Sequence, residues 1–171
     1  MATSKQRQAA ESLPEQIVDA VWNTGDTDRI DEFVKRNYVR HEPSRDDPIR
    51  GVDGFAAFVE DTRRAMPDLH VTVERAYADD EGRVVLVEFT LTGTQTGVLD
   101  GIPPTGRRMT IHGATRMRIE DGKVRGEYLY YDMAELRRQL GLTFPAILGT
   151  LPKFGRYYAG RLNERREARR A

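Results

Sequence analysis

The sequence predicts an α+β fold, because helical and extended patterns are grouped along the chain instead of alternating. Apolar residues recur at helical spacing in three segments before residue 67. From residue 69 to residue 132 they alternate with polar residues, as in strands with one buried face. A curved antiparallel sheet packed against three N-terminal helices would leave a concave pocket between the layers.

The first helix is predicted to run from about Leu13 to Asn23. Ser12-Leu13-Pro14-Glu15 has the form of a capping box with proline in the first turn, which is typical of a helix N-terminus. Residues 1–12 would then be a polar N-terminal arm. The apolar stripe of this helix consists of Ile17, Val18, Val21 and Trp22.

Two further helices and a short strand complete the first half. The second helix is expected to begin at Asp26 or Thr27, both good capping residues. The third runs from Gly51 to Met66, and Pro67 prevents its continuation. Residues 38–43 between them are expected to be extended, because proline disfavours helix in the residue before it.

A long loop divides the predicted strands. Residues 93–106 are rich in glycine and contain Pro103-Pro104, so they can continue neither a helix nor a central strand. The two prolines also remove amide donors, which makes a phosphate cradle improbable. We expect this loop to shape the mouth of the pocket or a dimer contact.

The last two strands are predicted to form a hairpin around Asp121-Gly122, because a type I′ turn needs positive φ at both central residues. Continuous pairing from this turn places Met117 opposite Gly126 and Ile111 opposite Asp132. The inward face would then consist of Ile111, Thr115, Met117, Ile119, Val124, Tyr128, Tyr130 and Asp132. A carboxylate in apolar surroundings survives only if it is paired or protonated, which is how a general acid or base arises.

Asp132 also has a purely structural interpretation. It stands directly before the helical pattern from Met133 to Leu140, and aspartate is a preferred N-cap. Capping and catalysis are compatible, so both interpretations stay open.

Composition limits the classes of function. The 171 residues carry a formal net charge of zero, so no overall field favours nucleic acid or membrane. The absence of cysteine excludes disulfides, thiolate zinc sites and a cysteine nucleophile, and three histidines leave little for a metal site. The first residues lack a signal-peptide pattern and no apolar run is long enough to span a bilayer, which predicts a cytoplasmic protein.

Residues 142–171 form a basic extension beyond the domain at 13–141. Phe154, Tyr157, Tyr158 and Leu162 can form one face of a basic amphipathic helix. We interpret the extension as a packed or frayed terminal helix with a solvated arginine face. The weaker alternative is contact with a membrane or a nucleic acid.

Several motifs, taken together and in order, resemble the SnoaL-like polyketide cyclases and ester cyclases of the nuclear transport factor 2-like superfamily. The motifs are Trp22-Asn23-Thr24-Gly25-Asp26, Arg40-His41-Glu42-Pro43, Gly51-Val52-Asp53-Gly54-Phe55, Met66-Pro67-Asp68-Leu69, the glycine-rich loop 93–107, Asp121-Gly122-Lys123-Val124, Asp132 and Gln139-Leu140-Gly141. This chain departs from the pattern at Gly126 and Tyr128, where such sequences usually carry Glu and Trp.

The resemblance implies a cone-shaped α+β barrel with a deep apolar pocket, a small hydrophobic ligand and a homodimer. It also implies that Asp132 is the general acid/base of an intramolecular aldol closure of a polyketide ester, without metal or cofactor. His41 is the second catalytic candidate, because a neutral imidazole can hydrogen-bond a carbonyl or enolate, although a loop-capping role is about equally compatible. The expected substrate-binding residues are Trp22, Phe55, Phe89, Met117, Tyr128 and Tyr130. Trp22 and the two tyrosines can instead be core residues.

Three functions stay open on the sequence alone. The first is cyclisation by general acid/base catalysis in the apolar pocket. The second is isomerisation or epoxide hydrolysis on the same fold. The third is a non-catalytic protein that binds a hydrophobic ligand, since a fold does not determine a function.

Overall fold

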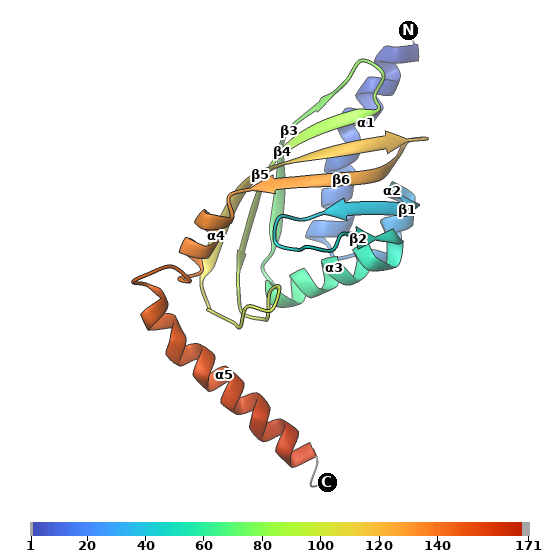
Figure 1. Ribbon diagram of the computed structural model, residues 1–171. Helices are drawn as coiled ribbons and strands as arrows, with labels where there is room; N and C mark the ends of the chain where they lie inside the picture. Colours follow the sequence, from blue (N-terminus) through green and yellow to red (C-terminus); the bar gives the residue numbers. More distant parts are fainter. Residues whose placement is uncertain (1, 169–171) are drawn as a thin grey trace.

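The strands predicted between residues 69 and 132 form most of one curved, unclosed sheet in the computed structural model, which describes residues 2–168 (Figure 1). The strand order is β2-β1-β6-β5-β4-β3, and every neighbouring pair is antiparallel except β1 and β6, which are parallel. The α+β prediction is confirmed. The strands are β1 Val34–His41, β2 Ile49–Arg50, β3 His70–Ala78, β4 Val84–Thr94, β5 Arg108–Glu120 and β6 Lys123–Tyr131.

Helices lie before the first strand, between β2 and β3, and after the last strand. The helical elements are α1 Ala2–Ile17, the π-helical turn η1 Val18–Asn23, the 3-10 turn η2 Thr27–Arg29, α2 Ile30–Phe33, α3 Gly51–Ala65, α4 Met133–Gln139 and α5 Ile147–Ala168. The predicted third helix and the helix after Asp132 are therefore confirmed to within a residue or two.

The predicted start of the first helix is wrong. Helix α1 already includes residues 2–12, and Ser12 donates its hydroxyl hydrogen bond to the Ala9 carbonyl instead of capping. The segment is rich in Ala, Lys, Gln and Arg, which are strong helix formers. Ala10 and Leu13 are buried, so tertiary packing stabilises this extra length.

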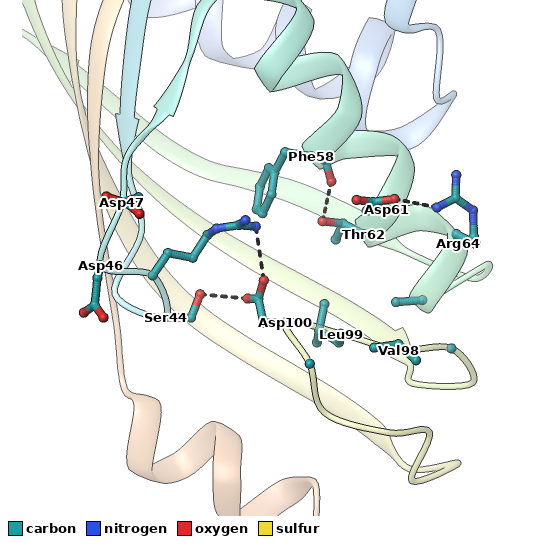
Figure 2. A pocket seen from close by; sticks show the side chains of 14 residues that line it. Ser44, Asp46, Asp47, Phe58, Asp61, Thr62, Arg64, Val98, Leu99 and Asp100 are labelled. Atoms are coloured by element: carbon teal, nitrogen blue, oxygen red, sulfur yellow. Dashed lines mark hydrogen bonds and ion pairs between the residues drawn. The ribbon is translucent and has the colours of Figure 1, made fainter. Parts of the chain in front are cut away.

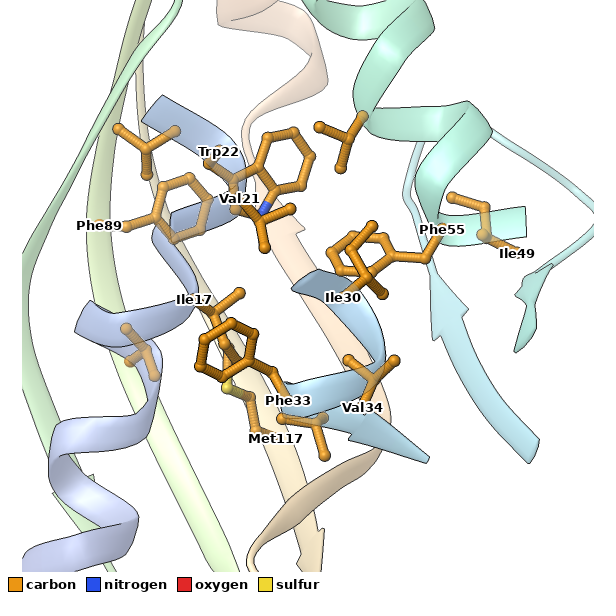
Figure 3. Packing of buried hydrophobic residues seen from close by; sticks show 14 of the residues in the cluster. Ile17, Val21, Trp22, Ile30, Phe33, Val34, Ile49, Phe55, Phe89 and Met117 are labelled. Atoms are coloured by element: carbon orange, nitrogen blue, oxygen red, sulfur yellow. The ribbon is translucent and has the colours of Figure 1, made fainter. Parts of the chain in front are cut away.

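The core lies between these helices and one face of the sheet. Figure 3 shows Ile17 and Trp22 from the N-terminal helix facing Phe89 and Met117 from the sheet, all in one buried cluster. Each fully buried side chain of this size contributes about 1.5–3 kcal/mol relative to an exposed one. Gly113 allows the close approach of Phe89, whose Cζ atom would lie 2.6 Å from a Cβ at that position.

The hairpin turn was predicted correctly, but the pairing beyond it was not. Asp121 and Gly122 both have positive φ, at 50° and 74°. Ile119 then pairs with Val124, but Arg118 pairs with Gly126, so Arg125 is an extra residue that forms a bulge. Because side chains alternate along a strand, a shift of one residue exchanges the two faces of β6 beyond the bulge.

The C-terminal helix α5 projects away from the body of the protein (Figure 1). Two hydrogen bonds attach its first turns: Thr150 Oγ1 donates to the Gly141 carbonyl at 2.9 Å, and Lys153 Nζ donates to the Thr105 carbonyl at 2.7 Å. Large apolar side chains along it are exposed, including Leu148, Leu151, Tyr158 and Leu162. None of the helices between residues 2 and 168 combines the length and apolar content that crossing a membrane requires.

Candidate active site

A narrow, mostly apolar cavity with two lobes lies between the helices and the sheet. Its central part is lined by Trp22, Arg40, Phe89, Leu91 and Leu129, which contact both lobes. The α4 lobe is further bounded by Glu42, Met66, Met109, Tyr131 and Leu136, and the α1 lobe by Ile17, Val71, Thr115, Met117 and Glu127. Each lobe has a volume of about 70 Å³.

Arg40, Glu42 and Glu127 form a buried charged cluster in the wall of this cavity. Arg40 donates through Nε to Glu42 Oε1 at 2.5 Å and through Nη1 to Glu127 Oε2. The parallel pairing of β1 with β6 sets Arg40 beside Glu127, and Glu42 follows on the same face because it lies two residues after Arg40. Their exposed fractions are only 2–8%, so the charges are stabilised by one another and not by water.

Aromatic rings hold the guanidinium group from the helix side. The Cζ atom of Arg40 lies 5.3 Å from the centre of the Trp22 ring, 5.8 Å from that of Phe55 and 5.5 Å from that of Phe58. A cation facing aromatic rings within about 6 Å is attracted by their quadrupoles. The planar donor group of Arg40 is thus fixed in orientation at the junction of the two lobes.

The direction in which the pKa of Glu42 shifts follows from this arrangement. Burial raises the pKa of Glu42 above its ordinary value, and the attraction of Arg40 offsets this only in part. One guanidinium cannot neutralise two carboxylates, so full ionisation would leave a net negative charge in an apolar wall. A proton on Glu42 removes that charge and makes the residue a carboxylic acid that can donate to a ligand.

The outer end of the α4 lobe is polar. Burial raises the pKa of the Tyr131 hydroxyl, which keeps it a neutral donor. Nearby, Ser44 Oγ donates to Asp100 Oδ2 at 2.8 Å, and Arg45 Nη1 donates to Asp100 Oδ1 at 3.3 Å. These two contacts join the tip of the loop 93–106 to the segment after β1.

A wide polar cleft opens outside this end of the cavity (Figure 2). Its volume is about 720 Å³, and it shares Ser44, Phe58, Thr62, Leu99 and Asp100 with the α4 lobe. Asp46, Asp47, Asp61 and Arg64 give the cleft a charged rim. A ligand can therefore approach through solvated, charged surroundings before it enters the apolar cavity.

Three of the six predicted substrate-binding residues line the cavity. Trp22 and Phe89 contact both lobes, and Met117 contacts the α1 lobe. Phe55 does not line either lobe: it is 1% exposed and packs behind Trp22, with ring centres 5.8 Å apart. Phe55 supports the wall from the core.

Three further predicted residues lie on the outer face of the sheet. The bulge turns Tyr128 and Tyr130 outward, where they are 41% and 54% exposed, and it brings Leu129 and Tyr131 inward instead. His41 stacks on Tyr128 with ring centres 4.2 Å apart, and both line a groove separate from the cavity. The predicted inward orientation is wrong for Tyr128 and Tyr130, and the catalytic candidate His41 does not line the cavity.

Asp132 is exposed and does not line the cavity. Its Oδ1 accepts hydrogen bonds from the backbone N–H groups of Ala134 at 2.8 Å and Glu135 at 3.0 Å, which makes it the N-cap of α4. The predicted capping role is confirmed, and the predicted inward orientation is wrong. The residue that precedes it, Tyr131, takes the inward place.

Comparison with known proteins decides the family. The family model described as SnoaL-like polyketide cyclase matches residues 14–140, which is most of the chain. The chain belongs to the SnoaL-like polyketide cyclase family. Among its relatives in this family are named cyclases, and on these similarities the protein is an enzyme of the cyclase type.

Two relatives share about a third of their residues with this SnoaL-like chain. The aklanonic acid methyl ester cyclase DnrD of Streptomyces peucetius is 33% identical over 141 residues, covering 82% of this chain and 96% of the relative. The nogalonic acid methyl ester cyclase of Streptomyces nogalater is 31% identical over 133 residues, covering 78% and 98%.

Solved structures support the same fold. TsrD from Streptomyces laurentii aligns with a TM-score of 0.70 at 28% identity, covering 80% of this chain and 98% of that one. A protein of ketosteroid isomerase-like fold from Catenulispora acidiphila aligns with a TM-score of 0.64 at 18% identity, covering 78% and 94%. At that identity the likeness concerns the fold alone.

The charged cluster was not predicted, although the sequence contains a signal for it. Tyr38, Arg40 and Glu42 alternate along one extended segment, so a buried Tyr38 requires the other two to face inward as well. His41, the residue that was predicted, has the opposite parity and therefore points outward.

Proposed function

We propose that this SnoaL-like enzyme closes a ring in the methyl ester of an aromatic polyketide acid by intramolecular aldol addition, without a cofactor. A base removes a proton next to a carbonyl group, and the enolate carbon attacks a ketone carbon of the same molecule. One C–C bond forms, the C=O π bond becomes an alkoxide, and a general acid protonates that oxygen. Substrate and product are therefore isomers.

The observation that carries this proposal is the buried acid Glu42 beside Arg40 in an otherwise apolar cavity. We assign Glu42 as the general acid, because burial raises its pKa and thereby favours the protonated form that can donate a proton. The positive charge of Arg40 lies at the same junction and favours an enolate or alkoxide oxygen over a neutral carbonyl.

Asp132 is the candidate for the base. The family resemblance assigns it this role, and one feature of the cap is compatible with it: only Oδ1 accepts the two capping hydrogen bonds. Oδ2 is free of the cap, and Asp132 directly follows Tyr131, which lines the α4 lobe. Closure of the mouth over a bound ester would be needed to bring Oδ2 to the substrate.

Kinetics on the methyl esters of aklanonic and nogalonic acid test the proposal. Wild type is expected to convert at least one ester into an isomer of equal mass and different retention in chromatography. Glu42→Gln and Asp132→Asn are each expected to lower kcat by about 10²- to 10⁴-fold, because each removes one proton-transfer group while keeping its shape. No conversion by wild type would refute the cyclisation, and full activity in either variant would refute that residue's assignment.

Three further properties belong to the proposal. We expect activity to survive exhaustive dialysis against a chelator, since no step uses a metal or cofactor. The cytoplasm is the proposed compartment, in keeping with a chain that has no cysteine and needs no disulfide. The homodimer implied by the family is testable by light scattering.

A further inference from the structure

Thr115 places an unpaired hydroxyl group in the wall of the α1 lobe. The residue is 4% exposed, lines the lobe, and its Oγ1 has no hydrogen-bond partner among the residues that the structure describes. A buried hydroxyl that is left unpaired lowers the stability of the folded protein, because it gives up its hydrogen bonds to water without replacing them. Its position on the cavity wall suggests that a ligand supplies the missing partner.

The charged cluster lies next to this hydroxyl. On the inward face of the sheet, Thr115 pairs with Leu129, and Glu127 lies two residues before Leu129 on β6. Thr115 and Glu127 are thus diagonal neighbours, whose Cα atoms are typically about 7–8 Å apart. Arg40 donates to Glu127 through Nη1, and both residues line the lobe, so the polar groups in its wall are those of Thr115, Glu127 and Arg40.

The rest of the α1 lobe is apolar. Ile17 and Val18 close it from the N-terminal helices, and Val71, Val73 and Val87 close it from the sheet. A ligand that enters this lobe must therefore be apolar along its body and carry its polar group at the leading end.

We infer that the α1 lobe is a binding subsite for the oxygen-bearing end of an aromatic ligand, with Thr115 as the residue that recognises a phenolic hydroxyl or carbonyl oxygen. The inference deepens the proposed function, on which it rests for the identity of the natural ligand. In that setting the α1 lobe positions the end of the ring system remote from the reacting carbons, which lie in the α4 lobe beside Glu42.

Two probes that differ in one hydroxyl group test this subsite without any turnover. Equilibrium dialysis with 2-naphthol and naphthalene is expected to show wild type binding 2-naphthol about tenfold more tightly. Thr115→Val keeps the side-chain shape and removes the hydroxyl, so it should abolish or reverse this preference. Because the free protein loses an unpaired buried group, the same variant should melt at an equal or higher temperature.

Two further variants test whether the preference for 2-naphthol over naphthalene arises in the α1 lobe. Thr150→Val removes a buried hydroxyl that already donates to the Gly141 carbonyl at 2.9 Å and lines neither lobe, so it should leave the probe preference unchanged. Val73→Phe places a larger side chain in the lobe at a half-buried position and should weaken the binding of both probes alike.

Three outcomes would each overturn the inference. They are equal binding of the two probes by wild type, no binding of 2-naphthol at its solubility limit, and an unchanged preference in Thr115→Val. None of these measurements requires catalysis. A failure of the proposed subsite can therefore be distinguished from a failure of the proposed cyclisation.

Discussion

The buried side chain of Gln95 fastens one end of the loop 93–106 to Thr105 at the other end. Gln95 Oε1 accepts hydrogen bonds from the backbone N–H of Thr105 at 3.1 Å and from its hydroxyl at 2.7 Å. Gln95 Nε2 lies 3.1 Å from each of three backbone carbonyls in the same loop. Residues 95–106, which follow the end of β4, thus satisfy several of their backbone groups through one amide side chain.

Replacing Gln95 by leucine is expected to lower the free energy of unfolding by roughly 3–5 kcal/mol, since several buried donors and acceptors lose their partner at once. Urea denaturation measures this. The same substitution at Gln16, which is exposed on α1, serves as the control and should change stability by no more than about 0.5 kcal/mol. A change below 1 kcal/mol in Gln95→Leu would mean that the loop is not held by this amide.

The capping role of Asp132 can be separated from any role in catalysis. Asparagine is as good an N-cap as aspartate, whereas alanine cannot accept the hydrogen bonds of Ala134 and Glu135. We expect Asp132→Ala to lower the free energy of unfolding by about 1 kcal/mol and Asp132→Asn to leave it nearly unchanged. Equal stability of the two variants in urea would contradict the cap, and a loss of kcat in stable Asp132→Asn would then report on catalysis alone.

The bulge at Arg125 explains why part of the site could not be read from the sequence. The Asp-Gly turn and the alternation of Val85, Val87 and Phe89 are local signals, and both led to correct structure. A bulge depends on how β6 meets β1 on its other side, where the pairing is also irregular between Val34 and Val39. That contact is not local, so continuous pairing assigned Tyr128 and Tyr130 to the wrong face.

The charged cluster was missed for a different reason. Residues such as Arg40 and Glu42 are normally exposed, and composition arguments treat them as surface. Only their mutual pairing across β1 and β6 makes burial acceptable, and that pairing joins residues 87 positions apart in the chain. Trp22, Phe89 and Met117 line the cavity, and their inward position could be predicted because large apolar residues on the inner faces of predicted elements need no such partner.

The distal part of α5 is expected to contribute nothing to the stability of the body. This helix contains Gly149, Gly155, Gly160 and Pro152, all poor helix formers, and beyond Lys153 the apolar side chains of Tyr158 and Leu162 are exposed. Removing residues 157–171 should change the free energy of unfolding by less than about 0.5 kcal/mol. Removing 143–171 also deletes Thr150 and Lys153 and should cost about 1–3 kcal/mol. Similar losses in both truncations would place a stabilising contact further along the helix.

Among the three residues of the charged cluster, Arg40 is expected to cause the largest loss in free energy of unfolding when it is replaced. Arg40→Met leaves Glu42 and Glu127 buried without their shared cation, which should cost about 3–5 kcal/mol. The triple variant Arg40→Met, Glu42→Gln, Glu127→Gln removes the uncompensated charges and should regain a large part of that loss. Chemical denaturation of both proteins at pH 7 makes the comparison, and an equally unstable triple variant would show that packing around Trp22, not charge, dominates.

The raised pKa of Glu42 predicts a pH dependence with a definite sign. The folded protein holds this proton more tightly than the unfolded chain, whose Glu42 titrates near 4.5. The stability that Glu42 contributes is therefore fully present below that pH and is lost as the pH rises through the folded-state pKa. The Glu42→Gln variant has no titrating group at this position. The difference in free energy of unfolding, wild type minus variant, should therefore decrease as the pH rises, by at most about 1.4 kcal/mol per pH unit. If Glu42 is the general acid, kcat of wild type should decline over the same pH range, as the pH rises through the folded-state pKa of Glu42, and the variant should lack that decline. A stability difference that rises with pH would show that Arg40 lowers the pKa of Glu42 instead, and the residue could then serve only as a base.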